Sequence, residues 1–191
     1  MVRNRVDLHD EQKTMQAFSS YRNSGMVMEA PPNMGFFCQR ARSFLRFVLE
    51  ELGISTLTRI GVRIFLLLPA QGFDELVASL RDNLYTLSSD QWDNLGGKAV
   101  DVGFPLTLQL GDNRANFMMG PMQKGQLESH FNSITVRDEL PKVVTFVDFD
   151  FYRHDPQIES GRIGRFVHQF LDTACHEIRD KTSHFLREIG S

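Results

Sequence analysis

The chain has 191 residues, of which 41% are hydrophobic and 24% are charged. This length and balance are typical of a globular protein with an ample core, so we expect a single domain over residues 1–191. The net charge of −3 lacks the basic surplus on which most nucleic-acid binders depend. The longest apolar run, Ile64–Ala70, is far shorter than the roughly 20 residues that span a bilayer.

The cellular compartment is predicted from the N-terminus and the cysteines. Residues 1–10 are charged and lack the apolar core of a secretory signal, so we expect a cytoplasmic protein. Cys38 and Cys175 are the only cysteines, and we expect them to be reduced core residues rather than a disulfide framework. Sixteen Phe against one Trp and three Tyr indicate a large apolar interior, or an interior together with an apolar interface.

The first 30 residues are polar and weakly patterned. Arg3–Leu8 alternates enough for a short strand, and Glu11–Tyr21 fits either a helix or a second strand. Met26–Glu29 predicts a brief strand that ends before the proline pair beginning at Pro31. We therefore expect residues 1–30 to add peripheral strands.

A helix and a strand follow. Asn33 stands at an N-cap position and Gly53 at the position of a C-terminal glycine, which predicts a helix between them. Its expected apolar face consists of Phe37, Ala41, Phe44, Leu45, Val48 and Leu52. Ile54–Leu68 then predicts a strand, and because residues 64–68 are all apolar we expect that end to be covered on both faces.

The middle of the chain predicts a second helix and a hairpin. Phe73–Leu87 has apolar residues at helical spacing, and the Asn-, Asp- and Gly-rich segment Ser88–Lys98 predicts a loop. Phe104–Leu110 and Ala115–Met119 are β-prone runs, and Gly111–Arg114 between them has turn chemistry.

The last third begins with the polar segment Pro121–Ser133, which we expect to be a connector. The strand Lys142–Tyr152 follows, and the chain closes with the amphipathic helix Arg162–Ile189, whose apolar stripe persists for about seven turns. These elements predict an α+β fold: an antiparallel or mixed sheet with helices packed mainly on one face and a long C-terminal helix.

The acidic end of the strand Lys142–Tyr152 is the strongest candidate for chemistry. Asp148 and Asp150 point to the same side, about 7 Å apart, near His154, so they are candidates for a divalent-cation site or for acid–base catalysis. The alternative is a salt-bridged surface, in which Arg59 and Arg63 of a neighbouring strand pair with the two carboxylates.

The terminal helix carries histidines at intervals of eight, His168, His176 and His184. At about 100° per residue they spread around the helix, so they cannot converge on one ion.

The same helix is also the expected partner surface. Arg162 and Arg165 lie at its positive dipole end, an unfavourable placement that predicts a contact with an anion or a partner. A salt bridge to Asp155 or Glu159 is the alternative explanation. Phe185 near the far end completes the predicted partner-binding residues.

Basic residues also gather on the first helix, where Arg40, Arg42 and Arg46 form a candidate patch for nucleic acid. No phosphate-binding loop or nucleophile elbow accompanies them, and we expect no cofactor.

The order of several short motifs is also informative. They are an aromatic-rich helix before Leu52-Gly53, the strand Arg59–Arg63, a hairpin ending in Phe117–Gly120, the strand Phe146–Asp150, and a final helix through Phe170 that ends near Phe185. From about residue 36 onward this order resembles a sporadically distributed, functionally uncharacterised family of bacterial proteins. The family usually opens with a proline-led apolar strand, which this chain does not show. The resemblance implies an accessory or defence-associated role in bacteria.

Two functional hypotheses follow. The first is a non-enzymatic module for protein–protein interaction or assembly, acting in a protein complex or a homo-oligomer. The alternative is a metal-dependent or small-ligand-binding enzyme that uses Asp148, Asp150 and His154.

Overall fold

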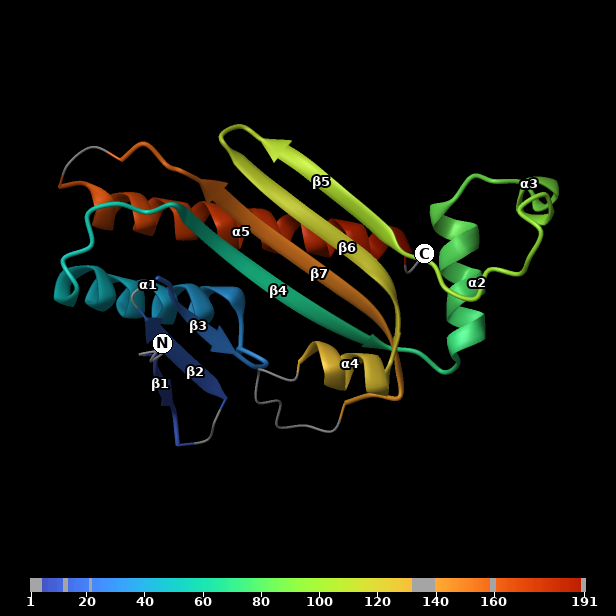
Figure 1. Cartoon of the computed structure of the whole chain (residues 1–191), viewed down its shortest axis with the longest axis horizontal. Helices are drawn as coiled ribbons and strands as arrows, with labels where there is room; N and C mark the ends of the chain where they lie inside the picture. The colour runs from blue at the N-terminus through green and yellow to red at the C-terminus, as the bar shows by residue number, and fades with distance from the viewer. Residues whose placement is uncertain (1–4, 12–13, 21, 132–139, 159–160, 190–191) are drawn as a thin grey trace. The chain divides into compact units, whose positions relative to one another are not determined.

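The computed structural model describes residues 5–11, 14–20, 22–131, 140–158 and 161–189. The fold is α+β, with two antiparallel sheets and a long C-terminal helix, as the sequence predicts (Figure 1). In chain order the elements are β1 (Arg5–His9), β2 (Met15–Ser20), β3 (Ser24–Met28), α1 (Met34–Glu51), β4 (Arg59–Pro69), α2 (Phe73–Leu84), α3 (Ser89–Asp93), β5 (Phe104–Leu110), β6 (Asn113–Gln123), α4 (Lys124–His130), β7 (Val143–His154) and α5 (Ile163–Ile189).

The chain divides into two compact units that share β4 and β7. The first unit contains β1–β3, α1, the start of β4, the end of β7 and most of α5. The second contains the rest of β4 and β7 together with α2, α3, β5, β6 and α4. The expectation of a single domain stays a prediction.

In the first unit, β1, β2 and β3 form a small antiparallel sheet in that order. Strands were predicted close to all three positions, and the helical alternative for Glu11–Tyr21 is wrong where β2 runs. Phe18 lies opposite Gly25 in the register, and a Cβ at Gly25 would lie 2.7 Å from the Phe18 ring. Any other residue at position 25 would therefore require the Phe18 ring to shift.

Helix α1 begins as predicted, because the side-chain oxygen of Asn33 accepts a hydrogen bond of 2.9 Å from the Phe36 backbone N–H. Gly53 follows with a φ of +58°, the left-handed conformation expected of a C-terminal glycine. The prediction that Leu52 belongs to the apolar face is wrong: it is the C-cap residue and is 56% exposed. Helical periodicity no longer sets the direction of a side chain at the cap.

A pairing of α1 with α5 corrects the expectation about the cysteines. Cys38 of α1 and Cys175 of α5 are both buried, and the structure joins them in a disulfide with their Cα atoms 6.8 Å apart. A sequence separation of 137 residues gave no indication of this proximity, which arises only when the two helices pack.

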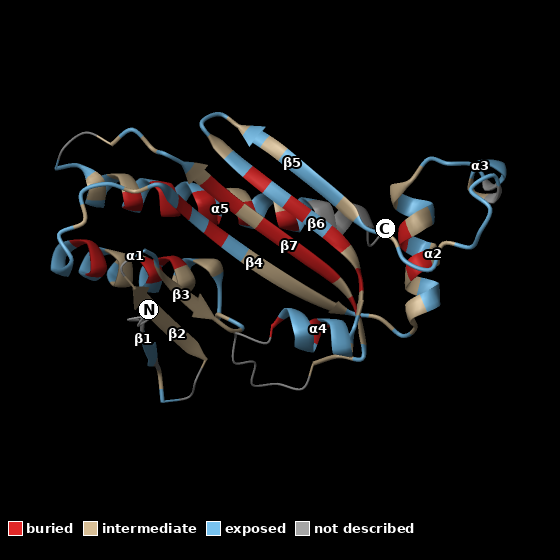
Figure 2. Cartoon of the chain, viewed as in Figure 1, coloured by how far each residue is buried: buried red, intermediate tan, exposed pale blue. Residues whose placement is uncertain are grey.

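The larger sheet has the strand order β4-β7-β6-β5, so β7 lies inside it and β4 at an edge. Val147, Phe149 and Phe151 of β7 are buried as predicted. Residues 64–68 of β4 are half-buried on both faces, whereas residues 59–63 alternate between exposed and buried, so the expected coverage of both faces is only partial. β4 is an edge strand, and Figure 2 shows the contrast in burial between β4 and the inner strand β7.

The predicted hairpin is present as β5 and β6, with Gly111 at a φ of +61° in the turn. β6 is longer than predicted and leads into α4, where a polar connector was expected over Pro121–Ser133; its residues 132–133 lie outside the described residues. At the start of α4 the side chain of Gln126 accepts a hydrogen bond of 2.7 Å from the backbone N–H of Gln123, and Leu127 anchors the helix by full burial. Short helices with polar surfaces have too little periodicity to predict.

Candidate functional site

The acidic residues of β7 lie beside β4, and one of them is in a tight ion pair. Arg63 donates from Nε to Oδ1 of Asp148 at 2.8 Å and from Nη2 to Oδ2 at 2.5 Å. Asp148 is only 7% exposed, whereas about half of the Arg63 side chain is exposed. The hydrogen bond to Asp148 raises the pKa of Arg63, and the negative charges of Asp148 and Asp150 add to this effect. The predicted cross-strand arginine partner is therefore present.

This geometry is unfavourable for the predicted binding of a metal ion at Asp148. Both Asp148 oxygens accept hydrogen bonds from Arg63, so a cation at Asp148 would have to displace a bidentate guanidinium. His154 stands six residues further along the strand, about 20 Å away at the usual rise of a strand. Its ring instead lies 5.1 Å from that of Tyr152. Within the described residues, no group of three or more His, Cys, Asp and Glu side chains is arranged to hold a metal ion.

The other predicted arginine partner has a different contact. The guanidinium of Arg59 lies over the ring of Tyr152, 4.7 Å from the ring centroid. Such a cation–π contact holds the planar guanidinium against the strand. A role for Asp150 in metal binding or catalysis stays a prediction.

Two of the three histidines of α5 have separate acidic partners. His168 Nδ1 lies 3.3 Å from Asp172 Oδ2, and His176 Nε2 lies 3.2 Å from Asp180 Oδ2. Both pairs join residues four apart on an exposed helix face, which is ordinary helix-surface pairing. His184 is exposed on the same helix.

The predicted partner-binding residues of α5 are only partly described. Arg162 and Arg165 are exposed at the start of the helix, and its first turn has no acidic residue. Glu159 and the side chain of Phe185 lie outside the described residues, although the backbone of Phe185 belongs to α5. The apolar side chains of α5 from Val167 to Ile178 are buried, so the exposed face of this stretch is polar.

The three arginines of α1 do not share one environment. Arg40 lies over the Phe36 ring at 5.2 Å, and Arg46 is exposed. Arg42 forms an ion pair with Asp172 of α5. The proposed nucleic-acid patch therefore has its middle residue already engaged, and nucleic-acid binding stays a prediction.

A second candidate surface was missed by sequence reasoning: the long segment 85–103 between α2 and β5, which contains α3. Its two ends are tied together, because the Tyr85 hydroxyl donates a hydrogen bond to the carbonyl oxygen of Gly103. α3 is held by a capping box between Ser88 and Gln91. The ring of Trp92 packs edge-on against that of Tyr85, with centroids 5.9 Å apart.

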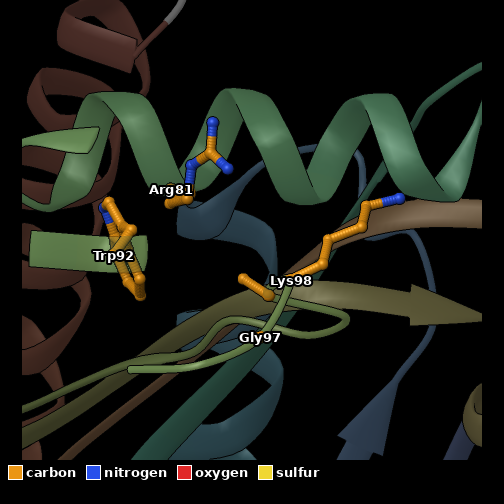
Figure 3. A pocket seen from close by; sticks show the side chains of 5 residues that line it. Arg81, Trp92, Gly97 and Lys98 are labelled. Atoms are coloured by element: carbon orange, nitrogen blue, oxygen red, sulfur yellow. The ribbon is translucent and has the colours of Figure 1, made fainter. Parts of the chain in front are cut away.

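A pocket of about 320 Å³ opens beside Trp92. It is lined by Arg81, Trp92, Gly97, Lys98 and Ala99. Figure 3 shows Trp92 on one side of the pocket, with Arg81 on α2 and the side chain of Lys98 extending away from Trp92. Arg81 is hydrogen-bonded to Asp82, which lowers the pKa of that carboxyl group, and Lys98 Nζ lies 3.8 Å from Asp74. The rim is thus polar and nearly charge-balanced.

The same segment exposes large apolar side chains. Val100 and Leu95 are 74% and 70% exposed, and Leu87 is 42% exposed. The sequence feature that could have identified this surface is the single Trp of the chain. It occurs with Leu95 and Val100 in a segment otherwise rich in Gly, Asn and Asp. Large apolar residues in a polar loop must be either buried or available to a partner.

Comparison with protein-family models finds no match, and neither do comparisons with curated proteins and with solved structures. Among the described residues, no helix is long and apolar enough to cross a membrane.

Proposed function

We propose that the protein is a non-enzymatic protein–protein interaction module, and that segment 85–103 is its main contact surface. The observation that carries this proposal is the exposure of Leu95 and Val100 beside the pocket at Trp92. Burial of these side chains by a partner would remove apolar area from water, which is the main favourable contribution to most protein association.

The construction of the segment supports this role. Long connections inside compact folds are uncommon and are often binding loops. Here the bond from Tyr85 to Gly103 holds the two ends together, so ordering the loop on binding costs less entropy. Trp is enriched among the residues that dominate interface energies, and the polar rim of Arg81 and Lys98 suits the edge of an interface.

The enzyme alternative is less well supported. Asp148 is one of its proposed ligands, and both of its carboxylate oxygens accept hydrogen bonds from Arg63. Another proposed ligand, His154, lies far from the Asp148 carboxylate along β7. The family resemblance favours a subunit of a bacterial accessory or defence complex. The charged N-terminus favours a cytoplasmic location, and we include both in the proposal. The proposed complex includes the case of a homo-oligomer, in which the partner is a second copy of the chain.

Copurification tests the proposal. The tagged protein is expressed in its source cell, and bound proteins are quantified for the wild type and for the double variant Leu95→Lys, Val100→Lys. The matched control is Phe47→Lys, Leu52→Lys, which adds the same charges at two exposed apolar positions, one in the last part of α1 and one at its C-cap. Light scattering of each purified protein reports self-association.

We expect the segment variant to lose a specific bound protein, or its own oligomer, and the α1 variant to keep it. Equal melting temperatures of the variants would show that the loss is not due to unfolding. A wild type that is monomeric and copurifies with nothing would overturn the proposal, and so would full retention of the partner by the segment variant.

A further inference from the structure

We propose that Cys38 and Cys175 form a redox-responsive cross-link between α1 and α5, present as two thiols under reducing conditions and as a disulfide after oxidation. The two Cα atoms are 6.8 Å apart, at the upper end of the range that a disulfide spans. Both residues are buried, 5% and 7% exposed, and the chain has no other cysteine that could compete. Oxidation therefore leads to one intramolecular product.

Cys38 has a partner in each redox state. Its Sγ lies 3.8 Å from the carbonyl oxygen of Leu171, to which a thiol donates a weak hydrogen bond. In the disulfide-bonded structure the sulfur has no proton to donate, so this distance becomes a hydrogen bond only when Cys38 is reduced to the thiol. Because Leu171 and Cys175 are four residues apart on α5, the same turn of the helix serves both states.

The surroundings keep the two helices adjacent whether or not the sulfurs are bonded. Arg42 lies one turn beyond Cys38 on α1 and forms an ion pair with Asp172, which precedes Cys175 by three residues on α5. Asp172 also contacts His168. The reduced protein therefore keeps the thiols in position for oxidation, and little rearrangement is needed when they bond.

The oxidant that we assign is a low-molecular-weight disulfide. One cysteine thiolate attacks it, forming a mixed disulfide and releasing one small thiol. The second cysteine then attacks the mixed disulfide, which forms the Cys38–Cys175 bond and releases the second small thiol. Two electrons pass from the protein to the oxidant, and the two protons of the cysteine thiols leave with the two released thiols. A reducing cytoplasm favours the reverse direction.

The test uses the full chain incubated with oxidised glutathione or with dithiothreitol. After removal of the reagent, the protein is unfolded in maleimide and its mass is measured. We expect no maleimide addition after oxidation and two after reduction. Digestion without reduction should yield one linked peptide that contains Cys38 and Cys175.

Stability provides the second readout. The cross-link closes a sequence separation of 137 residues and so restricts the unfolded chain strongly. We expect oxidation to raise the melting temperature of the wild type by about 5 °C or more. The variants Cys38→Ala and Cys175→Ala should show no such oxidation-dependent increase, whatever their absolute stability.

Two maleimide additions after oxidation would overturn the proposal, as would a disulfide between two chains on a non-reducing gel. An oxidised wild type with the linked peptide but an unchanged melting temperature would also overturn it, because the bond would then not constrain the fold. If the alanine variants fail to fold, the mass and melting measurements on the wild type still decide the question.

Discussion

Arg63 of β4 and Asp148 of β7 are joined by two parallel hydrogen bonds, one from Nε and one from Nη2 of the guanidinium to separate carboxylate oxygens. The carboxylate is buried while the guanidinium reaches solvent. The guanidinium therefore compensates a buried charge from the edge of the sheet.

Replacement of Arg63 tests this compensation. In Arg63→Met the Asp148 carboxylate stays buried without its partner, and we expect the free energy of unfolding to fall by about 1–3 kcal/mol. This loss is smaller than that for a fully buried pair, because half of the arginine is exposed and solvent screens its charge. Urea unfolding measures the effect. The double variant Arg63→Met, Asp148→Leu should recover much of the loss, and an equally unstable double variant would contradict the explanation.

The ion-paired arrangement also predicts how the protein responds to metals. Addition of Mg²⁺, Mn²⁺ or Zn²⁺ should shift the melting temperature of the wild type no more than that of Asp148→Asn, Asp150→Asn. The reason is that Arg63 occupies both oxygens of Asp148. A saturable, metal-specific stabilisation seen only in the wild type would instead support the enzyme hypothesis, because a bound ligand stabilises the folded state.

A cluster of rings around Phe146 forms part of the core of the second unit. Phe146 is fully buried, and its ring lies 5.8 Å from that of Phe65 and 5.0 Å from that of His130. We expect Phe146→Ala to cost about 3–5 kcal/mol of unfolding free energy through lost burial and a residual cavity. Phe47→Ala is the matched control: this residue is mostly exposed, so denaturant unfolding should show a change within about 0.5 kcal/mol.

Gly120 lies where the end of segment 85–103 approaches β6. A Cβ at Gly120 would lie 3.0 Å from the carbonyl oxygen of Val102. This oxygen belongs to the backbone, so a side-chain rotation cannot relieve the close contact. We expect Gly120→Ala to destabilise the protein by about 1–3 kcal/mol and to increase hydrogen exchange in the segment. Gly125 of α4 has open space around its Cα, so Gly125→Ala should be neutral or slightly stabilising. Equal effects of the two changes would contradict this account.

Asp180 on α5 gives the protein a small pH dependence in the acid range. Its pKa lies below the ordinary value of 3.8, chiefly because of the hydrogen bond from Arg179, with further lowering by the charges of His176 and Lys181. A lowered pKa stabilises the folded state above the ordinary value, and this stabilisation is lost as the pH falls through the lowered value. The melting temperature of Asp180→Asn should therefore fall slightly below that of the wild type at pH 6, and the two should converge toward pH 3.

A double-mutant cycle with Arg179→Met separates this effect from others. When Arg179→Met is present in both proteins, the effect of Asp180→Asn on the melting temperature at pH 6 should shrink, because the main cause of the lowered pKa is gone. An effect of Asp180→Asn that is independent of both pH and Arg179 would contradict the assignment.

The local sequence pattern was sufficient to predict the elements that are long and strongly periodic. The start of α1 at Asn33, the hairpin around Gly111 and the buried side of β7 depend on capping, turn chemistry and alternation, all of which act over a few residues. The short helices α3 and α4 were missed because a helix of one or two turns has too few residues to show a period. The coverage of residues 64–68 was overestimated, because an apolar run does not reveal how completely other segments pack over each face of its strand.

The candidate site, too, could be predicted from the sequence only in part. The residues Asp148 and Arg63 could be proposed as partners from their places on two predicted strands, but only the order β4-β7-β6-β5 made those strands neighbours. The proximity of Cys38 to Cys175 and the exposure of Leu95 and Val100 were likewise decided in three dimensions. Secondary structure depends mainly on contacts between residues that are close in the chain. Burial, ion pairing and cross-linking depend on which distant segments pack together, and a local sequence pattern does not contain that information.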